Sequence, residues 1–437
     1  MSHKNILTTF VLAIILTGGV TYNAVFAKFF EQGLVSTSAN NTHIGAEIAI
    51  SELDNSQYQP AVAYNWKHQE YLVVWENVWG GGGHDIYAQR VSDTGELKSW
   101  FYVPDDTTFT KHDRKQPAVA YDPVNDRYLV VWIYDTVGDG SNLDIHGRFV
   151  PWEGVDAGEK EFSINGWSSN QWEPKIAYGR TPEEFLVVWM NTPSGVSTYI
   201  SAQRITAATG AKPDSAISVT SGAENRDNPD VAFNLAQNQY LITWDINNSG
   251  SGFDVYGRRL HGGSNNFAGG EIGIAGWPGN EENPRVAACS AMDKYLVAWQ
   301  SAASGHDDVY VRFVNNDGSM EAPLLVGDTP ANEQYPEVAC TESGSIFMVV
   351  WNQQYSSTSG PYGVSGRFAY SDLTVSDDFA VRGVSVGGPN RWYPLIAGGY
   401  SNFLVTWEHL RSGTAYQDIH GVLATPYTVF LPLVIKN

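Results

Sequence analysis

One pattern of residues recurs seven times along the chain, and it restricts the possible folds more than any other feature. Each copy contains a run similar to P-x-V-A-Y, then a run similar to Y-L-V-V-W, then a run similar to D-I-Y-G-R. The prolines that open the copies are Pro60, Pro117, Pro174, Pro229, Pro284, Pro336 and Pro394. The tryptophans that end the second run are Trp75, Trp132, Trp189, Trp244, Trp299, Trp351 and Trp407. Consecutive tryptophans lie 57, 57, 55, 55, 52 and 56 residues apart. Self-similarity at a nearly constant period indicates a repeat architecture.

Each copy predicts four short β-strands. The first run alternates apolar residues of β-branched or aromatic type, as in residues 60–64, which favours a strand over a helix. The second run, as in 128–132, is apolar on both faces, as a strand covered on both sides should be. The third run is clear in 254–258. A weaker fourth run occurs at 162–166, 216–220, 271–275 and 323–327. Gly, Asn, Asp and Ser cluster between the runs, and these residues favour turns.

These strands predict an all-β fold, a seven-bladed β-propeller of four-stranded antiparallel blades over residues 45–425. A single four-stranded unit cannot bury two apolar faces, whereas a ring of such units covers each sheet with its neighbours and leaves few exposed edges. The recurring tryptophan then packs between blades. Burying about 200 Å² at roughly 25 cal/mol per Å² contributes on the order of 5 kcal/mol for each tryptophan, as an upper bound.

Two segments compete to close the ring. Residues 45–53 resemble the fourth strand of the other copies and precede the first copy, while the seventh copy ends near Ala424. We expect the N-terminal segment to complete the last blade. The C-terminal run 427–435 is also strand-like. One of the two should fill the open edge of the seventh blade.

The ends of the chain predict export. Lys4 lies in a short basic region, residues 6–20 are mostly apolar, and residues 25–27 form a small-residue cleavage site, so residues 1–27 predict a secretory signal peptide. An uncleaved anchor helix is the alternative. Residues 28–44 predict a polar linker, and 426–437 an apolar tail or closing strand. We expect a secreted or cell-surface protein with no membrane span after cleavage of the signal peptide.

The net charge and the motifs of the chain exclude several classes of function. The formal net charge of −21 would repel a phosphate backbone, so nucleic acid is not an expected partner. The chain has no H-x-x-H, C-x-x-C or H-E-x-x-H spacing, which argues against a zinc or copper site, and it has no serine nucleophile elbow and no phosphate-binding loop.

The two cysteines, Cys289 and Cys340, lie five and four residues after the prolines of adjacent copies. Neighbouring blades in an oxidising compartment could bring them together as a disulfide. The alternative is two small buried apolar residues, because offsets that differ by one can point to opposite faces of the strands.

Residues that recur in nearly every copy are expected to have a structural role, because they must serve every blade. An aspartate opens the third run at Asp85, Asp144, Asp254, Asp308 and Asp418. An arginine closes it at Arg90, Arg148, Arg204, Arg258, Arg312 and Arg367. We interpret them as a turn-capping carboxylate and a paired or stacked arginine. A ring of catalytic carboxylates is the alternative. Function is better sought where one copy departs from the others.

The departures are mainly aromatic. In propellers the loops between the second and third strands share a face with the loops that link the blades, and here both sets hold aromatic residues that the repeat does not require. The candidate ligand-binding residues are Trp79, Trp167, Trp172, Trp277, Tyr335 and Trp392. Aromatic rings beside amides and carboxylates suit sugars, whose faces are apolar and whose edges carry hydroxyls. An exposed aromatic cluster also suits a protein partner. Local packing within the loops is the alternative.

Three aspartates in one glycine-rich loop form a candidate metal site. Asp135, Asp139 and Asp144 offer the flexible, oxygen-rich environment that Ca²⁺ prefers, although their spacing differs from that of the twelve-residue helix-flanked calcium loop. Calcium is thus a possible ligand, and the sequence predicts no other cofactor.

The motif set P-x-V-A-Y, Y-L-V-V-W and D-I-Y-G-R resembles uncharacterised repeats of exported bacterial β-propeller proteins, and is loosely similar to TolB-like propellers. The resemblance implies a fold more than a function, because propellers serve as lectins, scaffolds and enzymes. The first hypothesis is a non-catalytic propeller that binds a glycan or a cell-surface partner on its tryptophan-rich face. The alternatives are a carboxylate-dependent glycoside hydrolase or polysaccharide lyase, and a structural surface or assembly protein. The sequence does not predict an oligomeric state.

Overall fold

The computed structural model of the chain describes residues 42–78, 82–105, 113–135, 137–156, 158–166, 169–248, 252–344, 346–354, 360–383, 389–411 and 413–426. The predicted signal peptide, nearly all of the predicted linker and the competing C-terminal strand therefore lie outside the described residues. None of the described ranges contains a helix with the length and apolar character that crossing a membrane requires.

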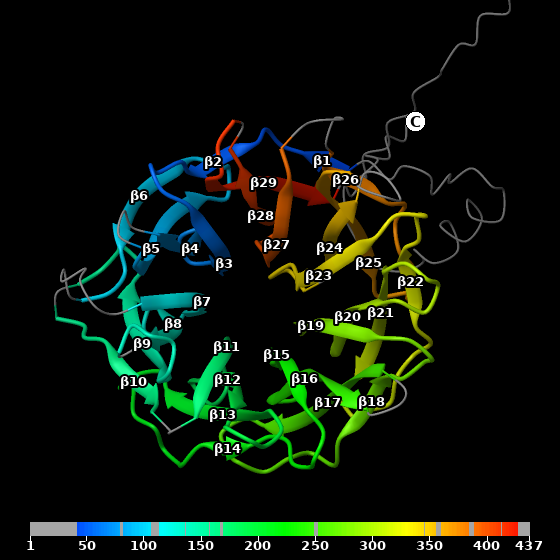
Figure 1. Cartoon of the computed structure of the whole chain (residues 1–437), viewed down its shortest axis with the longest axis horizontal. Helices are drawn as coiled ribbons and strands as arrows, with labels where there is room; N and C mark the ends of the chain where they lie inside the picture. The colour runs from blue at the N-terminus through cyan, green and yellow to red at the C-terminus, as the bar shows by residue number, and fades with distance from the viewer. Residues whose placement is uncertain are drawn as a thin grey trace, which may run out of the picture. The chain divides into compact units, whose positions relative to one another are not determined.

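Residues Ile44–Thr425 form one compact unit, and its sheets are arranged as seven blades around a channel (Figure 1). Blade 1 contains β3 (Gln57–Asn65), β4 (Glu70–Val78), β5 (His84–Ser92) and β6 (Leu97–Tyr102). Blade 2 contains β7 (Asp113–Asp122), β8 (Arg127–Asp135), β9 (Leu143–Pro151) and β10 (Phe162–Asn165). Blade 3 contains β11 (Asn170–Gly179), β12 (Glu184–Thr192), β13 (Tyr199–Thr206) and β14 (Ile217–Ser218).

The remaining blades repeat this order. Blade 4 contains β15 (Arg226–Asn234), β16 (Gln239–Asn248), β17 (Gly252–His261) and β18 (Ile272–Ala275). Blade 5 contains β19 (Glu281–Cys289), β20 (Lys294–Ser301), β21 (Asp308–Asn315) and β22 (Leu324–Gly327). Blade 6 contains β23 (Glu333–Cys340), β24 (Ile346–Gln354), β25 (Tyr362–Tyr370) and β26 (Phe379–Arg382). Blade 7 contains β27 (Arg391–Gly398), β28 (Phe403–Leu410) and β29 (Gln417–Pro426), joined by β1 (Thr42–Ile44) and β2 (Ile48–Ser51). The predicted seven-bladed propeller is confirmed.

The ring closes through the N-terminal segment. Strand β2 pairs antiparallel with β29, with Ile48 opposite Gly421 and Ala49 opposite His420. The prediction that residues 45–53 supply the outer strand of the last blade is therefore confirmed.

The seven repeat tryptophans form the cores between blades. Each is less than 2 % exposed. Trp132 of blade 2 packs with Leu72 and Val74 of blade 1, and Trp189 of blade 3 packs with Leu129 of blade 2. Each of these tryptophans therefore fills the interface with the preceding blade, as the periodicity predicts.

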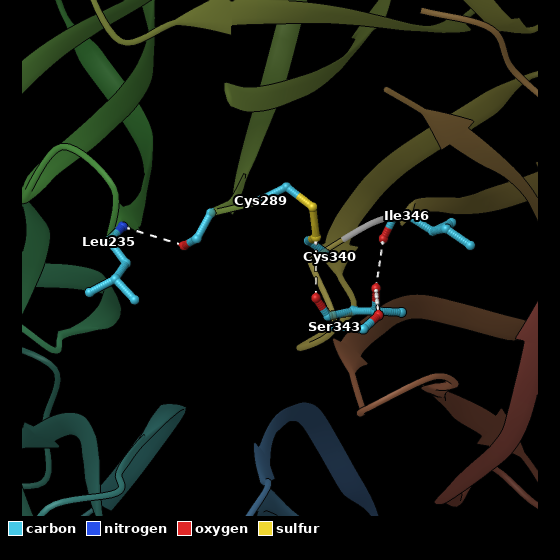
Figure 2. Close-up of a disulfide and its surroundings, with 7 residues drawn as sticks. Leu235, Cys289, Cys340, Ser343 and Ile346 are labelled. Atoms are coloured by element: carbon cyan, nitrogen blue, oxygen red, sulfur yellow. Dashed lines mark hydrogen bonds between the residues drawn. A yellow bond between two sulfur atoms is a disulfide. The ribbon is translucent and has the colours of Figure 1, made fainter. Parts of the chain in front are cut away.

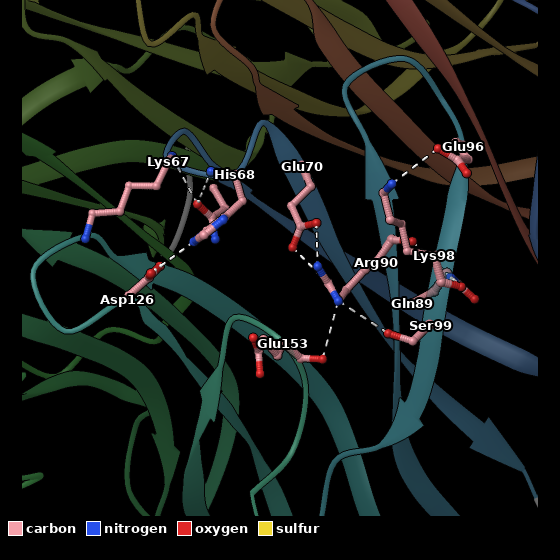
Figure 3. A network of polar contacts seen from close by, with 11 residues as sticks. Lys67, His68, Glu70, Gln89, Arg90, Glu96, Lys98, Ser99, Asp126 and Glu153 are labelled. Carbon is pink, nitrogen blue, oxygen red and sulfur yellow. Dashed lines mark hydrogen bonds and ion pairs between the residues drawn. The ribbon is translucent and has the colours of Figure 1, made fainter.

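The repeat arginines also connect blades. Arg90 makes two 2.8 Å contacts with Glu70 and reaches the carbonyl of Glu153 in blade 2 at 3.4 Å (Figure 3). Its guanidinium lies 4.9 Å from the ring centroid of Trp152. Three other arginines donate at 2.5 to 2.8 Å to a carbonyl at the outer strand of the preceding blade, and they are Arg148, Arg258 and Arg312. The structural interpretation of this arginine is confirmed.

Cys289 and Cys340 form a disulfide between β19 and β23, the innermost strands of blades 5 and 6, with their Cα atoms 5.5 Å apart (Figure 2). The difference of one residue in their offsets is accommodated because each lies at the last position of its strand.

Candidate functional site

Every innermost strand contains a bulge next to its proline. The residue before the proline has a left-handed backbone with φ between 49° and 55°, and these residues are Gln59, Gln116, Glu173, Asn228, Asn283, Tyr335 and Tyr393. A non-glycine residue in this conformation persists only when its surroundings hold it there, because the conformation costs on the order of 1 kcal/mol or more. All seven line the channel. The bulges therefore direct one ring of side chains to the channel wall.

A side chain from the neighbouring blade holds most of these bulges. The residue that follows the core tryptophan accepts the backbone N–H of the bulged residue, at N···O distances of 2.8 to 3.1 Å in five blades. The acceptor is an amide at Gln300 and Asn352 but a carboxylate at Glu76, Asp245 and Glu408. In these five blades the bulge is therefore held by an acceptor that need not be charged, whereas blades 2 and 3 have Ile133 and Met190 at this position.

Two of the three carboxylates face a groove beside the mouth of the channel, which we call the mouth groove. It has a volume of about 360 Å³ and extends over blades 7, 1, 2 and 3. It is lined by Tyr58, Gln59, Glu76, Lys115, Gln116, Trp172, Trp392, Tyr393, Glu408 and Gln417. The groove therefore combines aromatic rings, amides and two carboxylates on one surface.

The environment of Glu408 favours its protonated form. Its pKa is raised to about 7, mainly by burial and to a lesser extent by the nearby Glu76 carboxylate, while the backbone N–H of Gln59 opposes the rise. Glu76 itself accepts hydrogen bonds from Nδ1 of His84 at 2.5 Å and from the backbone N–H of Gln116 at 3.1 Å. The groove thus holds a proton donor that can act near neutral pH and a second, well-oriented carboxylate.

The aromatic residues at the mouth are accessible. Trp392 is 37 % exposed and meets Tyr362 edge to face, with ring centroids 6.5 Å apart. Tyr335 and Tyr393 are 38 % and 40 % exposed and also meet edge to face, at 4.9 Å. Their surfaces could receive the apolar face of a sugar ring.

The channel has a volume of about 390 Å³, and its wall is charged on one side and apolar on the other. The residue after the proline is charged in four consecutive blades, and these residues are Lys175, Asp230, Arg285 and Glu337. Arg285 Nε lies 2.7 Å from Glu337 Oε1. The same position is apolar in blades 7, 1 and 2, where it is Leu395, Ala61 and Ala118. Most of the channel's charge therefore lies away from the mouth groove.

The predicted ligand-binding residues fall into three groups. Trp172 and Trp392 line the mouth groove, and Tyr335 lines the channel. Trp277 is half-buried and packs against Trp299 and Tyr310, at centroid distances of 5.8 and 4.9 Å. The structure thus brings two of the six together and gives Trp277 a packing role. Trp79 and Trp167 lie outside the described residues.

The three loop aspartates have separate surroundings. Asp135 accepts the backbone N–H groups of Val137, Gly138 and Gly140 at 2.7 to 3.1 Å. Asp139 is exposed, and burial raises the pKa of Asp144. The groups of metal-type side chains with ligand atoms within 4.8 Å of one another, among the residues the structure describes, include none of the three. Calcium in this loop stays a prediction.

Sequence reasoning missed the carboxylates Glu76 and Glu408 and the mouth residues Tyr58 and Tyr393. A signal was present in the repeat. Glu76 and Glu408 directly follow the core tryptophan, Tyr58 lies two residues before its proline and Tyr393 one residue before its proline, and the residue type at each of these positions differs between copies. The comparison among copies that identified Trp172 would have found them if it had covered the strands as well as the loops.

No protein-family model and no curated protein matches the chain. Among solved structures it is similar to the polysaccharide lyase Uly1, with 10% identity and a TM-score of 0.54 over 88% of this chain and 99% of that chain. It is similar to an α-L-arabinofuranosidase from Fusarium graminearum, with 16% identity and a TM-score of 0.51 over 76% and 99%. A protein of unknown function from Dyadobacter fermentans has 9% identity and a TM-score of 0.51 over 88% and 99%. These likenesses place the chain in the class of β-propeller proteins by fold.

Proposed function

We propose that this protein is a carbohydrate-active propeller that hydrolyses a neutral glycan bound in the mouth groove. Glu408 is the proton donor and Glu76 is the second carboxylate. The observation that carries the proposal is the raised pKa of Glu408 in a groove that also contains Glu76, Trp172 and Trp392. Glycoside hydrolysis uses two carboxyl groups, one of them kept protonated near the working pH.

The chemistry assigns one role to each group. Protonated Glu408 donates its proton to the leaving glycosidic oxygen, and the Glu76 carboxylate acts at the anomeric carbon, directly or through water. Trp172 and Trp392 hold the apolar faces of the sugar rings. The amides Gln300 and Asn352 hold the bulges of blades 6 and 7, so the bulge does not require a carboxyl group, and those of Glu76 and Glu408 are available for chemistry.

Hydrolysis of a neutral glycan suits the charge of the groove better than cleavage of an acidic polysaccharide. Among the described residues that line the groove, Lys115 is the one cation, and it lies 2.8 Å from Asp113. The groove carboxylates and the net charge of −21 would repel a polyuronate. The fold is one that the polysaccharide lyase and the arabinofuranosidase also use, which agrees with a carbohydrate substrate.

Glycan binding without cleavage is the second candidate. It is favoured by the contacts of Glu408 with the N–H of Gln59 and of Glu76 with the N–H of Gln116, because the amides Gln300 and Asn352 make the same contacts in other blades. In that function both carboxylates would serve as structural acceptors, and the tryptophans would form a lectin-like platform for a glycan or a glycosylated surface partner.

The test is a panel of neutral and acidic polysaccharides assayed for retention and for release of reducing ends. We expect Glu408→Gln to lower release from a neutral glycan by about 10² to 10⁴-fold while retention persists. Trp392→Ala should weaken retention. Asp245→Asn changes an equivalent acceptor outside the groove and should leave both unchanged. Retention without release in the unmodified protein would establish the binding function. If the protein neither retains nor cleaves any polysaccharide, a glycan ligand is rejected.

We also propose that the protein works outside the cytoplasm after removal of residues 1–27. A disulfide between blades agrees with an oxidising compartment. N-terminal sequencing of the exported protein should begin at Lys28. A mature protein that retains residues 1–27 would contradict this prediction and indicate an anchor.

A further inference from the structure

The ring closure in blade 7 brings together two histidines and a glutamate from three segments. His409 lies on β28, His420 on β29, and Glu47 directly before β2. The imidazole rings stack with centroids 4.1 Å apart and an interplanar angle of 9°. Their Nδ1 atoms lie 3.5 and 2.9 Å from the same oxygen, Oε1 of Glu47. One ligand atom from each residue lies within 4.8 Å of the others.

Strand pairing explains this convergence. His409 is opposite Asp418 in the β28–β29 pair, and His420 follows two residues later on the same face. Ala49 is opposite His420, so Glu47 precedes it by two residues on that face as well. The three ligand groups therefore meet only when the N-terminal segment is docked on the C-terminal hairpin.

The spacing of the Nδ1 and Oε1 atoms is compatible with a transition-metal ion, which requires the stacked imidazole rings to rotate so that both nitrogen lone pairs point at it. Ligands about 2.0 to 2.1 Å from a tetrahedral Zn²⁺ are roughly 3.4 Å from one another, and the distances of 2.9 and 3.5 Å lie on either side of this value. Hydrogen bonding leaves Nδ1 of His409 and Nε2 of His420 buried without a partner. His420 is only 8 % exposed.

We propose that Glu47 Oε1, His409 and His420 bind a divalent transition-metal ion of the Zn²⁺ class, which fastens the N-terminal strand to the last blade. Outer partners orient two of the ligands. Arg382 lies 2.5 Å from the other oxygen of Glu47, and Glu52 lies 3.6 Å from Nε2 of His420. A cavity of about 320 Å³ adjoins both histidines and leaves room for a fourth ligand such as water.

The experiment uses the full, untagged chain after treatment with chelator. Titration calorimetry with Zn²⁺ should give one ion per chain, and added Zn²⁺ should raise the Tm by several degrees because the ion binds the folded state. His409→Gln and His420→Gln should each weaken Zn²⁺ binding by about 100-fold or more and abolish the rise in Tm.

The chain offers a matched control in His146. It is opposite Trp132 as His420 is opposite Trp407, and its Nδ1 lies 2.8 Å from Glu161. His146→Gln should bind Zn²⁺ like the unmodified protein. Unchanged Zn²⁺ affinity in His409→Gln, or no binding by the unmodified chain, would overturn the proposal.

If His420→Gln does not fold, Co²⁺ bound to the unmodified chain decides the question. Histidine ligation should give visible absorption bands that Zn²⁺ displaces, and bands that persist unchanged in His409→Gln would reject the site. None of the three ligand residues lines the mouth groove, and failure of either proposal leaves the other intact.

Discussion

At the scale of the residue, the acceptors beside the core tryptophans show how one position can serve structure in five blades and chemistry in two of them. The side-chain amides of Gln300 and Asn352 accept the backbone N–H of a bulged residue, and the carboxylates of Glu76, Asp245 and Glu408 accept the equivalent N–H in other blades. A buried carboxylate costs more to desolvate than an amide, so its charge should appear in the pH dependence of stability and of activity.

Asp245→Asn should stabilise the protein at alkaline pH. Burial raises the pKa of Asp245 to about 8, so the native state keeps a proton that the unfolded state loses between about pH 4 and pH 8. Stability therefore falls as pH rises through this window. We expect a gain on the order of 1 to 3 kcal/mol at pH 9 and little change at pH 5, measured by urea unfolding. Equal destabilisation at both pH values would show that the carboxylate is required as such.

The rate of glycan hydrolysis should fall as pH rises through about 7. Glu408 must carry a proton to act as the general acid, and burial raises its pKa to about 7. A profile of kcat against pH should therefore have its alkaline limb near pH 7. An unchanged rate up to pH 9 would remove Glu408 from the role of acid.

At the scale of the element, the innermost strands carry both the site and the covalent bond between blades. Strands β19 and β23 each contain a bulge at one end and a disulfide cysteine at the other. The bulges, with bulky residues such as Tyr335 and Tyr393 in the left-handed region, were not predicted. Sequence patterns predict strands from side chains, whereas five of these bulges are held by acceptors in the preceding blade.

Removal of the disulfide should lower stability without changing the fold. The double variant Cys289→Ala, Cys340→Ala should lose about 2 to 4 kcal/mol of unfolding free energy, because a bond across 51 residues restricts the unfolded chain. Reductant should lower the Tm of the unmodified protein to about that of the double variant, and it should leave the Tm of the double variant unchanged. A reductant effect in the double variant would mean that the loss has another origin.

At the scale of the whole molecule, the spacing of Trp75 and its six equivalents predicted the number of blades, and the likeness of residues 45–53 to a fourth strand predicted the closing segment. Positions within adjacent copies suggested the Cys289–Cys340 pair, but they did not predict the residues that meet at the groove or at the candidate metal site. The groove joins Glu76 to Glu408, and the candidate metal site joins Glu47 to His420, from opposite ends of the sequence. Such pairs follow from ring closure, so linear motif spacing cannot reveal them.

Substitution of a buried residue in the closing strand β2 should lower the free energy of unfolding. Ile50 on β2 is 3 % exposed and packs in one cluster with Trp75 and Ile419. Ile50→Ala should lose about 2 to 5 kcal/mol in denaturant unfolding. Leu97→Ala, at a position 42 % exposed, should lose less than about 0.5 kcal/mol. Equal effects of the two substitutions would argue against a packed closing strand.

The pairing of Ile48 with Gly421 also sets an order of events during protein synthesis. The ribosome makes β2 near the beginning of the chain and its partner β29 near the end. At roughly 5 to 20 residues per second, β2 waits on the order of tens of seconds before β29 can pair with it. A nascent chain of this topology therefore cannot complete its ring until its last blade has been made.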